Sequence, residues 1–376
     1  MTNPLLALPG AVASEPPDEG VPAHHGDPLA EQRAMDRSAA VIDRSNREII
    51  AVTGEDRLSW LHLLLTQHVS ELPAGAGTET LVLDLNGRVL HHAVLSHVGD
   101  TVWLDMEPGT GTALLDYLRS MVFWSKVEPW DAGGELALLS LVGPDTPGVL
   151  ARAGATPVPE QPYASVALPG GGLVRRMPAL CPASERSTSS AADLLVPRAE
   201  LTDWWLRLRK AGAAAAGTMA YEALRVGALR PRLGQDTDER TIPHEVGWIE
   251  SAVHLAKGCY RGQETVARVA NLGQPPRRLV LLHADGGDEE LPSAGDPVTL
   301  GTRTVGRVGT AVLHHELGGV ALALVKRTVP VEAELFAGLA ERICPVRIDP
   351  DSMPAQAGNE RPGRAARLKT GLIRPS

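Results

Sequence analysis

The chain has 376 residues, which is enough for two or three domains with well-buried cores. Its formal net charge of −9 argues against a nucleic-acid-binding surface or an anionic membrane as a partner. Cys181, Cys259 and Cys344 lie far apart in the sequence and have neither CxxC nor zinc-site spacing. This cysteine usage is typical of a reducing compartment, so a cytoplasmic protein is expected.

The two ends of the chain differ in composition from the middle. Residues 1–26 contain several prolines and no lysine or arginine, unlike a signal or transit peptide, and are expected to be a disordered leader. Residues 351–376 are rich in Pro, Gly and Arg and are expected to be a disordered basic tail. No apolar run reaches 18 residues, so no membrane span is expected.

Two stretches of similar element order follow the leader. In residues 27–130 the patterns predict a helix after Asp27-Pro28, a strand at 49–52, a helix, and a hairpin around Asn86-Gly87. In residues 131–274 a strand at 136–142 again precedes a helix and a hairpin. We therefore expect two related α+β halves with mainly antiparallel sheets, followed by a small all-β domain, a barrel or sandwich, at 275–350.

The run Lys257–Glu264, Lys-Gly-Cys-Tyr-Arg-Gly-Gln-Glu, combines a thiol with two glycines and two cations. Lys257 and Arg261 bracket Cys259 with positive charge, and a helix is predicted to begin at Gln263. Both features favour the thiolate, which is the reactive form. The alternative is that Cys259 is a small buried apolar side chain, the commonest fate of a free cysteine.

Two other candidate side chains each have a structural alternative. Tyr221, Leu224 and Arg225 share one face of a predicted helix at 218–229, where Arg225 can meet a ligand anion or form an internal salt bridge with Glu222 or Glu245. Asp84 can accept hydrogen bonds from a ligand, or it can form the turn before Asn86-Gly87.

The motif at Lys257–Glu264 resembles the signature of YgfZ-type folate-binding proteins, which are relatives of the glycine-cleavage T-protein. The resemblance extends over roughly residues 27–348 and includes the turn at 53–56, the hairpin at 84–89 and the segment 243–245. It implies two α+β halves and a C-terminal β-barrel around a central channel that binds tetrahydrofolate or a derivative. It also implies a role in assembling or repairing iron–sulfur clusters, with client enzymes or assembly proteins as partners.

The resemblance also implies roles for single residues. Cys259 would be the reactive residue, with Lys257 and Arg261 lowering the pKa of its thiol, and Glu264 would fix the loop. A lone thiolate cannot hold a four-cysteine cluster, so no permanent metal site is expected and Cys259 would bind iron or a cluster only transiently. The folate-binding candidates are Asp84, Tyr221, Arg225, Lys257, Tyr260, Gln263 and Glu264.

The sequence departs from T-protein at two places. His91 and His92 stand where aminomethyltransferases carry an acidic pair, and Gly227 stands where they carry a glutamate that holds the pterin. Aminomethyl transfer or demethylation, with one of the two histidines as a base, is therefore the first alternative to the iron–sulfur role. A non-catalytic folate-binding scaffold is the second.

Overall fold

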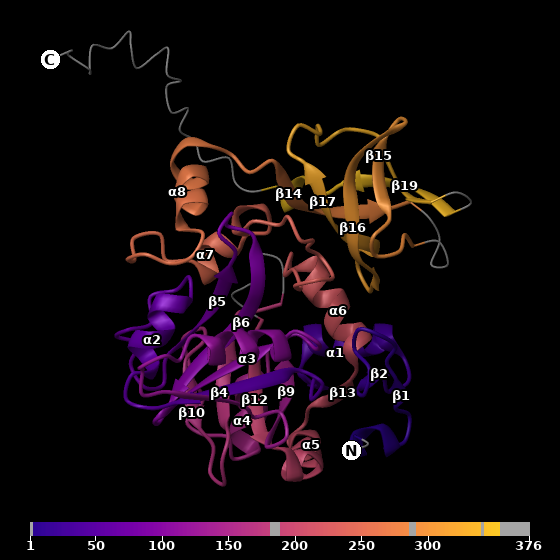
Figure 1. Ribbon diagram of the computed structural model, residues 1–376. Coiled ribbons are helices and arrows are strands. Elements are labelled where there is room, and N and C mark those ends of the chain that lie inside the picture. Colours follow the sequence, from indigo (N-terminus) through magenta and orange to yellow (C-terminus); the bar gives the residue numbers. More distant parts are fainter. Residues whose placement is uncertain (1–2, 181–188, 286–290, 340–341, 354–376) are drawn as a thin grey trace, which may run out of the picture.

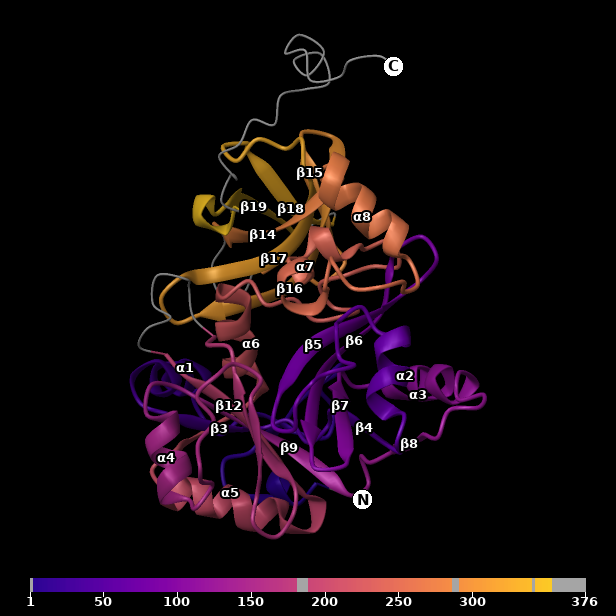
Figure 2. The same ribbon diagram turned by 90° about the vertical axis from the view of Figure 1, so that its left-hand side faces the viewer.

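The computed structural model describes residues 3–180, 189–285, 291–339 and 342–353. Two antiparallel-rich sheets lie side by side, and a closed barrel sits across one end of both (Figures 1 and 2). This confirms the expected α+β fold. Within the described residues, no helix is both long and apolar enough to cross a membrane.

The first sheet has five strands in the order β5-β6-β7-β4-β8, and every neighbouring pair is antiparallel. Two helices cover its outer face, because Trp60 and Leu61 of one and Leu114 of the other pack against strand residues such as Val52 and Leu104. The elements are β4 (Glu48–Thr53), α2 (Arg57–Leu64), β5 (Gly77–Leu83), β6 (Val89–Val98), β7 (Thr101–Met106), α3 (Gly111–Ser120) and β8 (Glu128–Asp131).

The second sheet has six strands in the order β10-β11-β12-β9-β3-β13. Its pairings are antiparallel except for β13 with β3, which is parallel. Although β3 lies in the stretch expected to form the first half, it completes the sheet of the second. The elements are β3 (Ala40–Asp43), β9 (Leu136–Val142), α4 (Thr146–Arg152), β10 (Ser165–Ala167), β11 (Leu173–Met177), β12 (Ala191–Pro197), α5 (Leu201–Lys210) and β13 (Ala214–Ala216).

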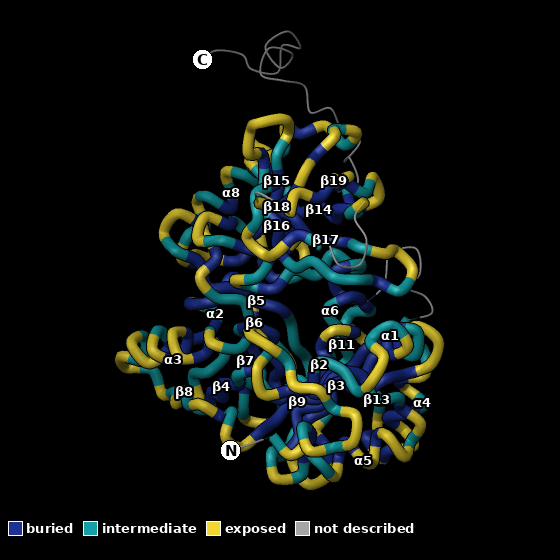
Figure 3. Tube along the Cα trace, turned by 90° about the vertical axis from the view of Figure 1, so that its right-hand side faces the viewer, coloured by how far each residue is buried: buried dark blue, intermediate teal, exposed yellow. Residues whose placement is uncertain are grey.

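The inner faces of the two sheets pack against each other. Ile49 and Ala51 of β4 contact a cluster that includes Leu138 of β9 and Leu195 of β12. On the other face of the six-stranded sheet, α4 and α5 bury Leu150, Trp204 and other apolar side chains. Figure 3 shows the result, with buried segments concentrated in the strands and exposed segments in the turns.

The barrel closes in the order β14-β17-β16-β15-β18-β19. Arg277 of its first strand fixes it to the preceding loop by pairing with Asp238 at 2.5 Å and with Glu245 at 2.8 Å. The remaining elements are α1 (Pro28–Arg37), α6 (Thr218–Gly227), α7 (Trp248–Ala252), α8 (Gln263–Leu272), β14 (Arg277–Ala284), β15 (Pro297–Leu300), β16 (Arg303–His314), β17 (Gly318–Lys326), β18 (Leu335–Leu339) and β19 (Arg342–Ile348), with 3-10 turns at Pro4–Ala7, Arg198–Glu200, Pro243–Glu245 and Pro350–Ser352.

The N-terminal segment differs from the disordered leader expected for residues 1–26. Residues 3–26 include a short sheet of β1 (Val12–Ala13) and β2 (Pro22–His24), and Leu5 is completely buried in the core beneath α4 and α5. Asp18 is ion-paired with Arg232 at 2.7 Å. The segment is ordered because it supplies both an apolar and a charged partner to the rest of the protein. The expected tail, from residue 354 onward, lies outside the described residues.

Each half contains a Gly-x-Asp turn, Gly54-Glu55-Asp56 in the first and Gly143-Pro144-Asp145 in the second, and the two turns have the same local geometry. Gly54 has φ +107° and Gly143 has φ +129°, and a Cβ on either would lie within 2.4 Å of a backbone oxygen of another segment. Glycine is required at both turns because each combines a left-handed conformation with a close backbone approach. In both halves the turn is followed at once by a helix that covers the sheet, α2 or α4.

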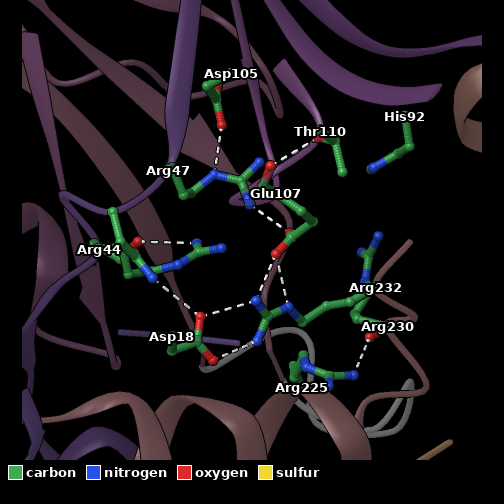
Figure 4. Close-up of polar contacts among 12 residues, drawn as sticks. Asp18, Arg44, Arg47, His92, Asp105, Glu107, Thr110, Arg225, Arg230 and Arg232 are labelled. Atoms are coloured by element: carbon green, nitrogen blue, oxygen red, sulfur yellow. Dashed lines mark hydrogen bonds and ion pairs between the residues drawn. The ribbon is translucent and has the colours of Figure 1, made fainter. Parts of the chain in front are cut away.

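Buried ion pairs connect the two sheets, the N-terminal segment and the loop after α6. Arg47 lies between Asp105 (2.9 Å) and Glu107 (2.5 Å), and Arg232 lies between Glu107 (2.7 Å) and Asp18 (Figure 4). Burial alone would lower the pKa of Arg47, but Glu107 and Asp105 raise it overall. Arg175 extends the network to the second sheet by pairing with both Asp105 and Asp193.

We predict that Arg47→Met lowers the free energy of unfolding by about 3–5 kcal/mol, because it leaves Asp105 and Glu107 buried with fewer cations. The exposed pair of Lys126 and Glu55 provides the control, and Lys126→Met should change stability by less than about 1 kcal/mol. Urea unfolding followed by circular dichroism measures both. Equal effects of the two substitutions would contradict a structural role for the network.

Candidate functional site

A cavity of about 980 Å³ lies where the two sheets, α6, α7 and the barrel meet. This volume is at the upper end of the range of about 300–1,000 Å³ for small-molecule sites. Its walls are unusually rich in charged and hydrogen-bonding side chains. These include Arg44, Arg47, Glu79, His92, Asp105, Glu107, Tyr163, Asp193, Tyr221, Arg225, Arg230, Arg232, Trp248, Glu250 and Ser251.

Glu79 of β5 is the centre of one polar group in this wall. Its Oε1 accepts a hydrogen bond from the Tyr163 hydroxyl at 2.6 Å, and its Oε2 accepts one from the Ser251 hydroxyl at 2.7 Å. His92 Nε2 lies 3.4 Å from Oε2, and Arg230 lies 3.8 Å from Oε1. Burial alone would raise the pKa of Glu79, but its contacts with His92, Arg230 and Tyr163 lower it to about 2. The carboxylate is therefore ionised at neutral pH.

His92 and Trp248 form a stacked pair in the cavity wall, with ring centroids 4.6 Å apart and planes inclined by 6°. Neighbouring residues of a strand point to opposite faces, and only His92 of the two adjacent histidines lines the cavity. The other, His91, is mostly buried, and burial lowers the pKa of its imidazole to about 4. The histidine that can meet a cavity ligand is therefore His92.

Tyr221 and Arg225 of α6 both line the cavity, as expected, but both have internal partners. Arg225 pairs with Glu222 at 2.5 Å and Asp236 at 2.8 Å, and it donates to the hydroxyl of Thr310 in the barrel. The internal salt bridge with Glu222 that the helix spacing suggested is therefore present. Arg225 joins α6 to the following loop and to the barrel.

Cys259 is a free, exposed cysteine, and it is not part of the cavity wall. Lys257, two residues earlier, is buried and turns away toward α2. Its Nζ donates hydrogen bonds to the carbonyl oxygens of His62, Leu65 (2.6 Å) and Gln67 (3.3 Å). Burial lowers the pKa of Lys257 to about 8. The ammonium group thus caps the carbonyl end of α2 and anchors the cysteine loop to the first sheet.

The other residues of the motif surround this anchor. Tyr260 is buried next to the Lys257 ammonium, 5.3 Å from ring centroid to Nζ, and burial raises the pKa of its hydroxyl to about 12. The Gln263 side chain donates to the Lys257 carbonyl at 3.2 Å, which closes the loop at the start of α8. Arg261 and Glu264 are exposed. None of these residues lines the cavity.

Asp84 lies in the turn between β5 and β6. Its Oδ1 accepts hydrogen bonds from the backbone amides of Asn86 and Arg88, both at 2.8 Å. This is the turn-forming role that the sequence left open. The turn packs against the cysteine loop, because a Cβ on Gly262 would lie 2.5 Å from the Asp84 carbonyl oxygen.

Among the residues that the structure describes, no group of metal ligands includes Cys259. Among the described residues, the three ligating side chains whose donor atoms lie within 4.8 Å of one another are Asp36, His315 and Glu316. Two of these three are exposed carboxylates, a common arrangement without a metal.

No sequence pattern singles out Glu79, Tyr163, Arg230, Trp248 or Ser251. They come from β5, from the loop before β10, from the loop after α6 and from α7, and only the fold brings them together. Tyr163 carries a local structural signal, a φ of +64° that a non-glycine residue rarely adopts. No comparable signal is visible in the sequence.

Comparison with known proteins identifies the family. Residues 22–257 match the family model described as the GCVT N-terminal domain. The chain belongs to this family. Its six-stranded sheet, five-stranded sheet and cavity wall are drawn largely from the matched residues.

Individual relatives are similar over most of the chain. An aminomethyltransferase of Rubrobacter xylanophilus is 28% identical over 92% of this chain and 91% of its own length. An aminomethyltransferase of Streptomyces avermitilis is 26% identical over 81% of this chain and 83% of its own. A putative chloroplastic transferase of Arabidopsis thaliana is 26% identical over 73% of this chain, which spans 62% of that protein.

The same fold occurs in a solved structure. The crystal structure of glycine cleavage system aminomethyltransferase T from Bartonella henselae matches with a TM-score of 0.79 at 20% identity, covering 92% of this chain and 94% of that one. The T-protein-like fold is therefore established for this chain. The YgfZ-type subgroup stays a prediction from the cysteine motif.

The low pKa of the partly buried His91 predicts a pH dependence of stability. Because its pKa is near 4 in the folded protein and about 6.5 when unfolded, protonation favours the unfolded chain as the pH falls from 6.5 to 4. Above pH 6.5 this difference in pKa contributes up to about 3 kcal/mol to the free energy of unfolding. That contribution is lost as the pH falls to 4. His91→Asn should therefore lose less stability than the parent protein between pH 7 and pH 4.5 in urea unfolding. Identical losses would contradict the assignment.

Proposed function

We propose that the protein binds a reduced folate in the central cavity and acts as a folate-dependent transferase of an aminomethyl or methyl group. The observation that carries this proposal is the stacked His92–Trp248 pair beside the ionised Glu79, inside a cavity of about 980 Å³. The family of the chain and the names of its aminomethyltransferase relatives support it. A cytoplasmic location remains part of the proposal.

The cavity wall fits the chemistry of a folate. A pterin is flat and bears hydrogen-bonding edges, and the wall offers aromatic rings together with the hydroxyls of Tyr163 and Ser251. The glutamate tail is anionic, and the wall contains guanidinium groups, which suit carboxylates. When bound, the folate supplies a ring nitrogen that accepts the one-carbon unit.

His92 is the proton acceptor in this proposal. Its Nε2 faces Glu79, which stabilises the imidazolium that forms when Nδ1 takes a proton from the donor amine. Glu79 is held in place by Tyr163 and Ser251, so it acts as a positioning residue. The histidine would thus replace the acidic residue that aminomethyltransferases have at this place.

The test compares the two adjacent histidines. Purified protein should bind tetrahydrofolate by calorimetry under anaerobic conditions and should turn over an aminomethyl or methylamine donor. His92→Asn should lower turnover by about 10²-fold or more, because it removes the acid–base group. His91→Asn, outside the cavity, is the matched control and should retain turnover. Absence of folate binding by the parent protein would refute the proposal.

A role in assembly or repair of iron–sulfur clusters is the second candidate, and the exposure of Cys259 favours it. An exposed thiol on a loop anchored by Lys257 is accessible to client enzymes or assembly proteins, and it can engage iron or a cluster transiently. In the non-catalytic scaffold alternative, folate binding persists while neither His92 nor Cys259 is needed.

Two cysteine variants separate these candidates. In a strain that lacks the native protein, Cys259→Ala should reduce the activity of an iron–sulfur enzyme to the level of the empty strain. Cys344→Ala, which alters a buried cysteine in the barrel core, is the control and should support activity in proportion to its folded amount. Full activity with Cys259→Ala would exclude the iron–sulfur role of this residue.

A further inference from the structure

The arginines that line the cavity are not equivalent. Four of the five have a carboxylate within 4 Å, whereas Arg44 has none among the described residues. A guanidinium group is always charged, and a partly buried charge without a counter-ion is unfavourable. The four paired arginines are Arg47, Arg225, Arg230 and Arg232.

Neutral groups fix the position of Arg44. It lies in the turn between β3 and β4, and its Nη1 donates to the hydroxyls of Tyr221 (2.8 Å) and Ser140 (3.3 Å). The guanidinium lies over the Tyr221 ring, 4.1 Å from the centroid. Stacking on one face and hydrogen bonding at one nitrogen orient the group without neutralising its charge.

The remaining donors of Arg44 are available to a ligand. Its Nε and Nη2 make no hydrogen bond within the described part of the chain, and neither is fully buried. In Figure 4 the Arg44 side chain lies beside the Arg47–Glu107 pair. A guanidinium fork with free donors in a ligand-sized cavity is the usual arrangement for binding a carboxylate.

We propose that Arg44 forms a carboxylate-binding subsite of the cavity. This inference rests on the proposed function, because it assigns one end of the ligand that the cavity would hold. The sequence suggested Arg225 and Lys257 for this role, but the first is paired with Glu222 and Asp236 and the second caps α2. The carboxylate belongs either to the glutamate tail of the folate or to a separate small acid bound beside it.

The experiment measures binding of three probes to the parent protein and to Arg44→Gln by calorimetry. The probes are tetrahydrofolate, 6-methyltetrahydropterin (which lacks the tail) and glycine in the presence of the tetrahydropterin. Arg44→Gln should weaken at least one carboxylate-bearing probe by about tenfold or more, since a charge-assisted hydrogen bond is lost. It should leave the affinity for tetrahydropterin unchanged.

The outcomes distinguish the two sources of the carboxylate. Loss confined to tetrahydrofolate identifies the glutamate tail, and loss confined to glycine identifies a separate acid. Unchanged affinity for both, or an equal loss for tetrahydropterin and tetrahydrofolate, overturns the inference. If the parent protein binds none of the probes, the proposed function itself fails.

Two further variants test whether the lost binding comes only from a disturbed structure. Arg44→Lys keeps the charge and should recover part of the affinity. Arg347→Gln removes an exposed guanidinium in β19 of the barrel that does not itself line the cavity, and should bind all probes as the parent does. A melting temperature of Arg44→Gln close to that of the parent would exclude unfolding as the cause of lost binding.

Discussion

Buried pairing of arginines with carboxylates is the constraint on which the rest of this structure depends. Arg47 and Arg175 each contact two carboxylates and Arg232 contacts three, so each guanidinium joins parts that are distant in sequence. Such groups contribute little net stability relative to an apolar core, but removing one partner is costly. The pairing therefore specifies how the sheets, α6 and the N-terminal segment fit together. It also makes the cavity between them polar, where apolar side chains would otherwise pack.

Balanced charge also limits what the cavity can bind. Most of its arginines and carboxylates neutralise one another, so the groups left to recognise a ligand are few: the aromatic pair, the hydroxyls around Glu79, and Arg44. A site of this kind selects for shape and for a small number of charges at fixed positions. Many charged side chains of the cavity wall therefore pair with one another and hold the fold together, even though they line the cavity.

The sequence predicted the fold well because its signals were local. Asp27-Pro28, the glycines of the two Gly-x-Asp turns and Asn86-Gly87 each dictate a backbone conformation, and each stands at the element boundary it predicted. The site was less predictable because its residues meet only through long-range pairing. In the sequence, Glu79 looks like any polar residue of a strand, and no motif distinguishes Ser251 from the other serines. For Arg225 and Asp84 the sequence offered both a ligand role and an internal partner, and spacing alone could not decide between them.

The position of β3 has a consequence for how the chain folds. β3 and β4 are consecutive, yet β3 pairs with β9 and β13 in the six-stranded sheet while β4 pairs with β7 and β8 in the other. Residues 40–43 emerge early during synthesis and cannot find their partners until residues 136–142 and 214–216 have been made. Closing such long loops is entropically costly and slows folding. The five-stranded sheet, whose strands all lie within residues 48–131, is therefore expected to form before the six-stranded sheet, which waits for β9 and β13.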